Sequence, residues 1–291
     1  MDQAETLRNI IKLQNQRTVT NARVITVTSG KGGVGKSNTS INLALQFQKM
    51  GKKVIILDAD FGLANVEVMF GVIPKYNMGD LIFNGMDIKD IITEGPEGVG
   101  FISGGSGIAK LVNLDKDQVK NLVGKLSQLE EFADVIIIDT GAGISPAVME
   151  FILETVLVTT PEPTSITDSY ALLKALSMTD SYDSSVNKVK MLANRVSNEK
   201  EGRNLYEKLN SVVTKFLNIK MEYLGHVVYD DNMTKAVMSQ KPVTIMYPHS
   251  PASRCYENIV STLETGHAVS QNAGVRSFFR NVFSRKMKNG D

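Results

Sequence analysis

The sequence is poor in cysteine: Cys255 is the single cysteine among 291 residues. One thiol cannot form an intramolecular disulfide, and it cannot supply the several sulfur ligands of a structural zinc site or an iron–sulfur cluster. This scarcity excludes a cluster-bearing reductase or an iron–sulfur carrier. We therefore expect an intracellular protein without a cysteine-based metal cluster.

Long hydrophobic runs are also absent. No stretch of about 18 apolar residues occurs, so we expect no transmembrane helix. The first residues, MDQAETLRN, are polar and lack the apolar region of a signal peptide. The formal net charge is only +1, so the bulk charge does not indicate a polyanion-binding protein. The composition, with 42% hydrophobic and 22% charged residues, is that of a soluble globular protein, which we expect in the cytoplasm.

What the sequence does contain is a series of short, β-branched apolar segments separated by stretches of helical periodicity. The apolar segments are 22–29, 52–60, 98–105, 133–141, 155–163, 188–195, 222–231 and 242–248. The helical stretches are 36–51, 115–132, 163–179, 198–217 and 252–265. Strands that are apolar on both faces are typical of a sheet covered by helices on both sides. The alternation predicts a doubly wound, mainly parallel α/β sheet of about eight strands, in one domain over 22–266.

The segment after the first predicted strand, GKGGVGKS, matches the phosphate-loop pattern Gly-x-x-x-x-Gly-Lys-Ser. Glycines let backbone N–H groups point at phosphate oxygens, and the N-terminus of the following helix adds a positive partial charge. Lys36 would reach the β- and γ-phosphates of ATP, and the Ser37 hydroxyl would bind Mg²⁺. A plain glycine turn is the alternative interpretation. The predicted nucleotide-binding residues of the loop are Gly30, Lys31, Gly32, Gly33, Val34, Gly35, Lys36, Ser37 and Asn38.

Lys31 lies outside the minimal pattern. With this second lysine, GKGGVGKS resembles the deviant phosphate loop of the ATPase superclass that includes MinD, ParA, the nitrogenase iron protein and the arsenite-pump ATPases. In that group the early lysine crosses a dimer interface to the partner's ATP, where a positive charge stabilises the transferring phosphoryl group. The resemblance implies a P-loop NTPase fold, an ATP-dependent homodimer, and catalytic roles for Lys31 and Lys36. A solvated loop lysine is the alternative.

Carboxylates stand at the carboxyl ends of two predicted strands, where ligands bind in an open α/β sheet. The resemblance implies that Asp60 orients the attacking water and that Asp58 supports the phosphates and the metal. Asp139 fits the carboxylate that holds Mg²⁺ through water, and Gly143 would bring a backbone amide near the γ-phosphate. The sequence departs from the family pattern at Gly141, where the superclass usually has proline. Because phosphoryl transfer depends on positioning and charge neutralisation, we expect a slow, switch-like ATPase.

The end of another predicted strand, MLANRV, carries Asn194. The resemblance implies that Asn194 pairs with the adenine edge, since an amide offers both a donor and an acceptor. A turn residue at a strand end is the alternative. Residues 159–170 resemble a proline-containing switch of the family, and 229–237 are expected to close the base pocket.

The C-terminal residues 275–291 have an amphipathic helical pattern that follows a polar linker at 267–274. Five Lys or Arg against one Asp give this segment a charge of +4, which leaves the rest of the chain at −3. The pattern favours a helix lying in an anionic membrane interface, and it is too short to span. A helix docked on the protein's own core is the alternative. The predicted membrane residues are Val275, Phe278, Phe279, Val282 and Phe283.

The N-terminal residues 1–21 precede the predicted domain, and their stretch DQAETLR resembles the activator segment of the FlhG family, also called FleN or YlxH. These are MinD-like ATPases of flagellar placement, and in them this segment stimulates the signal-recognition-type GTPase FlhF. The resemblance implies partner contacts through Asp2, Gln3, Leu7 and Arg8, with the Gln3 amide able to orient a water in the partner's active site. Without the resemblance, the sequence of this segment predicts only an ordinary helical arm.

Three other functions compete with a flagellar ATP switch that binds the inner face of the cell membrane reversibly. A MinD-type division-site regulator explains the C-terminal helix but not the N-terminal segment. A ParA-type DNA-partitioning ATPase requires a basic surface, which the charge of −3 outside the tail disfavours. A scaffold that binds nucleotide without turnover is disfavoured by Asp60. The resemblance also implies flagellar switch-ring proteins as partners, and we expect no sequence-specific nucleic-acid binding.

Overall fold

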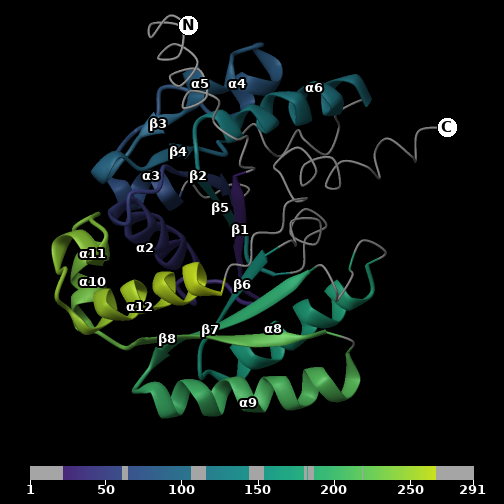
Figure 1. Ribbon diagram of the computed structural model, residues 1–291, viewed down its shortest axis with the longest axis vertical. Helices are drawn as coiled ribbons and strands as arrows, with labels where there is room; N and C mark the ends of the chain where they lie inside the picture. Colours follow the sequence, from purple (N-terminus) through teal and green to yellow (C-terminus); the bar gives the residue numbers. More distant parts are fainter. Residues whose placement is uncertain are drawn as a thin grey trace, which may run out of the picture.

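The structure is a computed structural model, and it describes residues 22–60, 65–105, 116–143, 154–179, 182, 187–217 and 219–266 (Figure 1). The predicted N-terminal segment, with Asp2, Gln3, Leu7 and Arg8, lies outside the described residues. The predicted linker and C-terminal helix, residues 267–291, lie outside them as well. Both segments therefore stay predictions.

The described chain forms an eight-stranded sheet in the order β3-β4-β2-β5-β1-β6-β7-β8. Every strand pair is parallel except β3–β4, which is antiparallel. The strands are β1 Arg23–Thr28, β2 Val54–Ala59, β3 Thr93–Glu94, β4 Gly100–Ile102, β5 Val135–Thr140, β6 Glu154–Thr159, β7 Lys188–Val196 and β8 Met221–Val228. The predicted doubly wound, mainly parallel α/β fold is confirmed.

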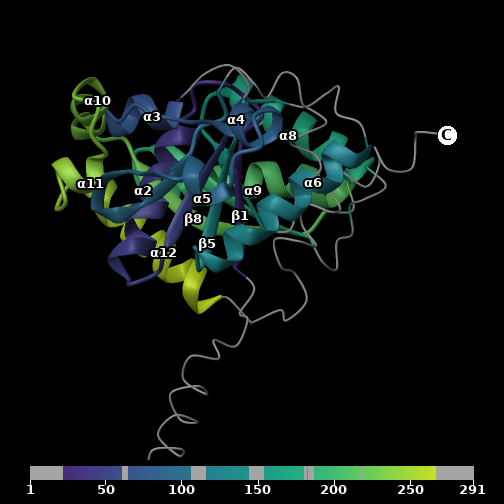
Figure 2. The ribbon, with the colours of Figure 1, turned by 90° about the horizontal axis from the view of Figure 1, so that it is seen from above.

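Helices cover both faces of the sheet because alternate residues of its central strands point to opposite sides. Ile25 and Val27 of β1 belong to one hydrophobic cluster, whereas Val24 belongs to another. The first face carries α2 Lys36–Lys49, α3 Asn65–Phe70, α10 Asp231–Met238, α11 Val243–Met246 and α12 Pro251–Thr265. The second carries α4 Met78–Phe83, α5 Ile88–Ile91, α6 Lys116–Ser127, α8 Pro163–Ser177 and α9 Glu199–Phe216. Figure 2 shows α2, α11 and α12 on one side of the strands and α6 and α9 on the other.

One predicted strand was wrong: residues 242–248 contain the short helix α11 instead. Its Val-Thr-Ile sequence suits a strand, but Pro242 at the N-cap position starts a helical turn, and Val243 is buried against the α2–α12 core. The two-residue strand β3 and the helices α3, α4 and α5 were not predicted. Each of them is at most six residues long, which is too short to show a hydrophobic period.

A buried ionic network closes the edge at which the parallel strands begin. Arg23 on β1 donates two hydrogen bonds of 2.8 Å to Glu154 on β6, and it also reaches Glu264 and the Leu263 carbonyl on α12 at 3.0 Å. Lys190 on β7 donates to the same Glu154 carboxylate at 2.8 Å. Burial opposes ionisation of Glu154, but its bonds to Arg23 and then its proximity to Lys190 lower its pKa to about 2. The network joins strands β1, β6 and β7 to helix α12.

In the part of the chain that the structure describes, none of the helices is long and apolar enough to cross a membrane. Cys255, on α12, is a free and partly buried thiol. Burial raises the pKa of this thiol.

Candidate active site

The predicted phosphate loop connects β1 to α2, at the edge where the parallel strands end. Gly35 immediately precedes α2 with φ +95°, a left-handed conformation that favours glycine, and a Cβ there would collide with the Asn194 amide nitrogen. That nitrogen donates to the Val34 carbonyl at 2.7 Å, and Asn194 is buried. Asn194 thus supports the loop from β7. This bond uses one N–H of the amide, so its second N–H and its oxygen remain for the predicted contact with a base.

The start of the loop packs between two other segments. A Cβ on Gly30 would collide with the backbone of Asp168 and Ser169 in α8, so the loop approaches that helix closely. The Gly143 amide donates to the Ser29 carbonyl at 2.9 Å. The predicted contact of Gly143 with a γ-phosphate therefore requires this bond to open. Of the other loop residues, Gly33 has φ +76°, and Gly32 and Gly33 are exposed.

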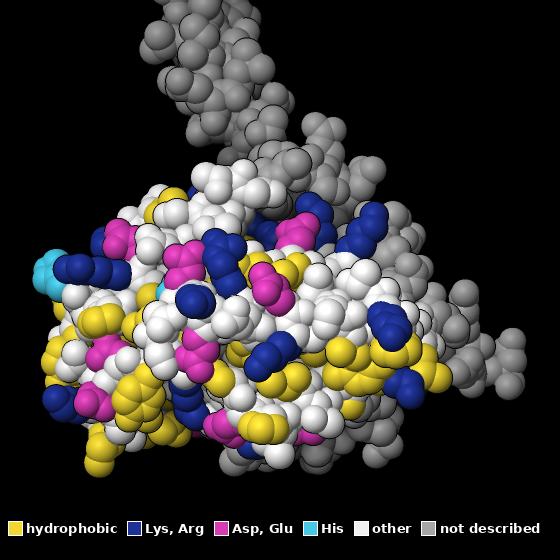
Figure 3. Space-filling model, turned by 90° about the horizontal axis from the view of Figure 1, so that it is seen from below, with side chains coloured by type: hydrophobic (Ala, Val, Ile, Leu, Met, Phe, Trp, Pro, Cys, Tyr) yellow, Lys and Arg dark blue, Asp and Glu magenta, His cyan; other side chains and the backbone are white. Residues whose placement is uncertain are grey.

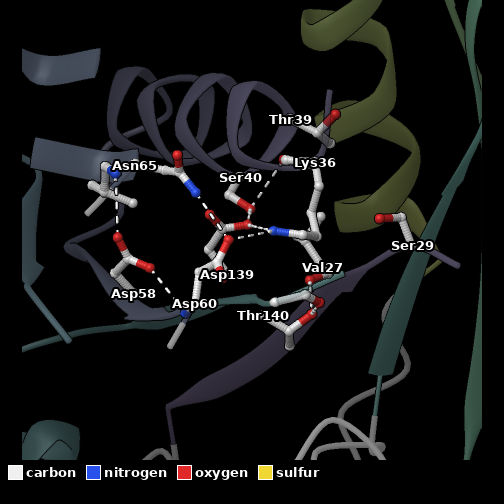
Figure 4. A network of polar contacts seen from close by, with 12 residues as sticks. Val27, Ser29, Lys36, Thr39, Ser40, Asp58, Asp60, Asn65, Asp139 and Thr140 are labelled. Atoms are coloured by element: carbon white, nitrogen blue, oxygen red, sulfur yellow. Dashed lines mark hydrogen bonds and ion pairs between the residues drawn. The ribbon is translucent and has the colours of Figure 1, made fainter. Parts of the chain in front are cut away.

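Lys36 lies among the carboxylates that the sequence pointed to (Figure 4). Its Nζ donates to Asp139 Oδ1 at 3.3 Å and lies 4.0 Å from Asp60 Oδ2. Asp58 and Asp139 are register partners on β2 and β5, so they reach the same edge of the sheet. Lys36, Asp58 and Asp139 are buried. The predicted convergence of these four side chains is found.

Asp58 and Asp60 precede residues 61–64, which lie outside the described chain. Asp58 Oδ1 accepts the Asp60 amide at 3.1 Å, and its Oδ2 accepts the Val66 amide at 3.2 Å. Asn65 donates from Nδ2 to Asp60 Oδ2 at 2.9 Å. Asp58 therefore links the backbone before residues 61–64 to the backbone after them, while Asn65 orients the carboxylate that is predicted to position water.

The cluster carries more carboxylates than cations, and their pKa values reflect this. Burial, and then the charge of Asp139, raise the pKa of Asp58 to about 7. Burial also raises the pKa of Asp60, although the Lys36 ammonium opposes that rise. The charge of Asp139 disfavours ionisation of both Asp58 and Asp60, so a bound cation would stabilise the site.

Magnesium fits the residues present. Asp139 Oδ2 is buried and has no hydrogen-bond partner among the described residues, and Ser37 is the second residue of α2. No group of three or more His, Cys, Asp or Glu side chains able to hold a metal occurs within the described ranges. Mg²⁺ commonly takes one or two protein ligands and completes its shell with phosphate oxygens and water. Ser37 and Asp139 are the residues that would hold it.

Gly141, where the superclass usually has proline, affects the space around the Asp60 carboxylate. A Cβ at position 141 would lie 3.3 Å from Asp60 Oδ1, a tight contact that glycine avoids. Gly141 follows β5 directly and is partly exposed. Glycine here gives the Asp60 carboxylate more room than proline would.

Lys31 does not point into its own phosphate loop. Its Nζ donates to Glu162 Oε2 at 2.6 Å and to Thr164 Oγ1 at 2.7 Å, at the start of α8. The Lys31 bond lowers the pKa of the exposed Glu162 carboxyl. Glu162 and Thr164, which belong to the predicted proline-containing switch 159–170, therefore hold the second lysine.

A cavity of about 430 Å³ opens beside the phosphate loop, between the ends of β7 and β8 and helix α10. It has mainly apolar walls with a few polar groups, as is usual for sites that bind a flat heterocycle. Segment 229–237, which was predicted to close a base pocket, contributes five of its residues. The lining residues are Gly35, Asn38, Asn194, Arg195, Val227, Val228, Tyr229, Asp230, Met233, Thr234, Val237, Met238 and Tyr256.

Sequence reasoning missed three polar residues of the site. Ser40 donates to Asp139, Asn65 donates to Asp60, and Glu162 accepts from Lys31. Ser40 had a local signal, because it stands three residues after Ser37 on the same face of α2. Glu162 had none, since its contact spans 131 residues.

A family model and several known proteins are similar to this chain. The family model described as "CobQ/CobB/MinD/ParA nucleotide binding domain" matches residues 25–243. The antiactivator FleN of Pseudomonas aeruginosa is 38% identical over 88% of this chain and 91% of its own. The flagellum site-determining protein YlxH of Helicobacter pylori is 35% identical over 97% of this chain and 98% of its own. The Pyrococcus horikoshii septum site-determining protein MinD, solved with Mg-ADP, superposes with a TM-score of 0.66 at 22% identity, covering 84% of this chain and 96% of that one.

Proposed function

Because the chain belongs to the CobQ/CobB/MinD/ParA nucleotide-binding family, as a MinD-like ATPase of the FleN/YlxH type, we propose that it is an ATP-dependent switch in flagellar placement or number. The observation that carries the ATP chemistry is the convergence of Lys36, Asp60 and Asp139 beside the phosphate loop. The flagellar role is supported by the two relatives above 30% identity, one an antiactivator and one a flagellum site-determining protein.

In the proposed reaction each side chain has one task. Lys36 leaves Asp139 and binds the β- and γ-phosphate oxygens. Asp60, held by Asn65, orients the attacking water. Mg²⁺, held by Ser37 and Asp139, neutralises charge on the phosphate oxygens when it is bound. Positioning and charge neutralisation are sufficient for a slow turnover.

The proposal also includes that the chain forms a dimer when it binds ATP. Lys31 exchanges its bonds to Glu162 and Thr164 for the phosphates of the partner subunit's ATP. Its exposed position on the loop and its place in GKGGVGKS support this role. Two C-terminal helices on one dimer would then bind an anionic membrane far better than one, because the second contact is effectively intramolecular.

Stimulation of an FlhF-type GTPase is the part that ties the protein to flagella. The test adds the full-length protein to that GTPase and measures GTP hydrolysis, with Gln3→Ala as the matched variant. Stimulation by the native chain and its loss in the variant are expected. No stimulation would leave the ATPase intact and favour a MinD-type division-site regulator.

Membrane binding is tested by co-sedimentation with anionic liposomes in the presence of ATP. The double variant Phe278→Glu with Phe279→Glu should stay in the supernatant. Phe216→Glu, at an exposed phenylalanine on α9, is the control and should sediment like the native chain. Persistent sedimentation of the double variant would mean that the C-terminal helix serves another purpose.

A division-site regulator is the second candidate, supported by a 27% identical MinD of Bacillus subtilis that covers 89% of this chain. A DNA-partitioning ATPase has less support. The face in Figure 3 mixes Lys and Arg with Asp and Glu, and this part of the described surface lacks the basic stripe that phosphate binding needs.

A further inference from the structure

Ser40 is the closest hydrogen-bond donor to the carboxylate of Asp139. Its hydroxyl donates to Asp139 Oδ1 at 2.8 Å, whereas the Lys36 ammonium reaches the same oxygen at 3.3 Å (Figure 4). Both Ser40 and Asp139 have no exposed surface. All bonds to the carboxylate among the described residues therefore fall on one oxygen, and Oδ2 has no partner.

The direction of the hydrogen bond follows from the chemistry of the two groups. An ionised carboxylate only accepts hydrogen bonds, so the Ser40 hydroxyl is the donor. A bond to a charged acceptor in a buried setting is among the stronger ones in a protein. Ser40 Oγ is farther, at 3.3 Å, from the Lys36 carbonyl, which is the usual helical acceptor. The hydroxyl therefore bonds preferentially to Asp139.

ATP binding changes the balance between the two donors. Lys36 turns to the phosphates, and Ser40 is left as the side chain that still holds Oδ1. We propose that Ser40 is a positioning residue, which fixes the rotation of the Asp139 carboxylate so that Oδ2 stays available to the metal. Helix α2 then presents two hydroxyls one turn apart: Ser37 for the metal and Ser40 for the carboxylate that serves it. This inference rests on the proposed role of Asp139 in holding Mg²⁺.

The experiment separates metal binding from nucleotide binding. The dissociation constant of a fluorescent ATP analogue is measured for the full-length chain across a Mg²⁺ titration and again in excess EDTA. The Mg²⁺ midpoint is the Mg²⁺ concentration that gives half of the full increase in nucleotide affinity. In Ser40→Ala this midpoint should rise about tenfold, as is usual when a group that orients a metal ligand is removed. Affinity in EDTA should stay within about twofold, since no phosphate contact is lost.

Two further variants separate positioning from a structural effect. Ser253→Ala removes another buried hydroxyl, which bonds the Tyr247 carbonyl at 2.8 Å, and it should leave the Mg²⁺ midpoint unchanged. In an Asp139→Asn background, Ser40→Ala should add less than about a twofold change, because the group through which it acts is already altered. An unchanged midpoint in Ser40→Ala, or an equal loss of affinity in EDTA, would overturn the proposal.

Different results would refute the proposed role of Ser40 and the proposed metal role of Asp139. If Asp139→Asn itself keeps the native Mg²⁺ midpoint, the metal role of Asp139 is wrong. If Asp139→Asn shifts the midpoint and Ser40→Ala does not, only the role of Ser40 is wrong. Should Ser40→Ala fail to fold, Ser40→Cys keeps nearly the same volume with a weaker donor. Its Mg²⁺ midpoint should lie between the native value and the value expected for Ser40→Ala, and an unchanged midpoint would refute the inference.

Discussion

The two edges of the sheet each hold a buried cluster of charges, and the clusters are built in opposite ways. Where the strands begin, Arg23 and Lys190 face Glu154, and the pKa of that carboxyl falls to about 2. Where the strands end, Lys36 faces Asp60 and Asp139, Asp58 lies beside Asp139, and the pKa of Asp58 rises to about 7.

The difference separates a structural cluster from a site prepared for a ligand. The first cluster pairs its charges within the chain and holds strands and a helix together. The second keeps an excess of negative charge and a buried Asp139 oxygen without a partner, which costs stability until a cation arrives. Natural proteins accept such a cost at functional sites.

Breaking the cluster of Arg23, Glu154 and Lys190 should have the largest effect on stability. Glu154→Gln leaves the buried Lys190 without its anion and leaves Arg23 with Glu264 alone, and we expect a loss of about 3–5 kcal/mol in the free energy of unfolding at pH 7. Urea denaturation measures this loss, and ATP affinity should be unchanged.

The acid dependence of that variant checks the mechanism. The folded pKa of Glu154 lies below its ordinary value of 4.5, so its stabilisation is complete above about pH 4.5 and is lost as the pH falls through about 2. The difference between native and variant should therefore shrink between pH 5 and pH 2. A constant difference would mean that packing, not charge, explains the loss.

Removing Lys36, the lysine of the cluster with excess negative charge, should have the largest effect on ATP affinity. Lys36→Ala should weaken ATP binding about 100-fold, because charge-assisted bonds to the phosphates disappear. Calorimetric titration measures this change. Lys190→Ala removes an equally buried lysine at the other edge and should leave ATP affinity unchanged. Equal affinity in native and Lys36→Ala chains would refute the loop assignment.

The raised pKa of Asp58 predicts an opposite pH dependence to that of Glu154. The folded chain binds the Asp58 proton up to about pH 7 and the unfolded chain only to about pH 3.8, so this group lowers stability as pH rises from about 4 to 7. The slope should be at most about 1.4 kcal/mol per pH unit. Asp58→Asn should remove this slope when the nucleotide-free chain is unfolded by urea across that range. Identical slopes would show that Asp58 ionises normally.

The smallest effect is expected at the exposed pair of Lys31 and Glu162. Glu162→Gln should move the melting temperature by less than about 2 °C, because solvent-exposed ion pairs contribute little to stability. Differential scanning calorimetry measures this shift. A large loss of stability would make the pair a structural contact and would weaken the proposal that Lys31 leaves it readily.

Much of the fold and of the site could be predicted because the signals were local. The GKGGVGKS loop, and Asp58 and Asp139 at strand ends, were predicted to converge because parallel strands end at one edge. The network around Arg23 could not be predicted, since its contacts reach Glu154 and Glu264 across 131 and 241 residues. Asn65 was missed because it begins the six-residue helix α3, which is too short to show a hydrophobic period. Residues 242–248 were misassigned because packing overrode β propensity.

The bonds from Arg23 to Leu263 and Glu264 have a directional consequence. They tie Arg23, near the beginning of the described chain, to the last turn of α12, near its end. This junction lies where the strands begin, at the edge opposite the phosphate loop. A second copy of the chain that approaches Lys31 would therefore not meet the Arg23–Glu264 junction.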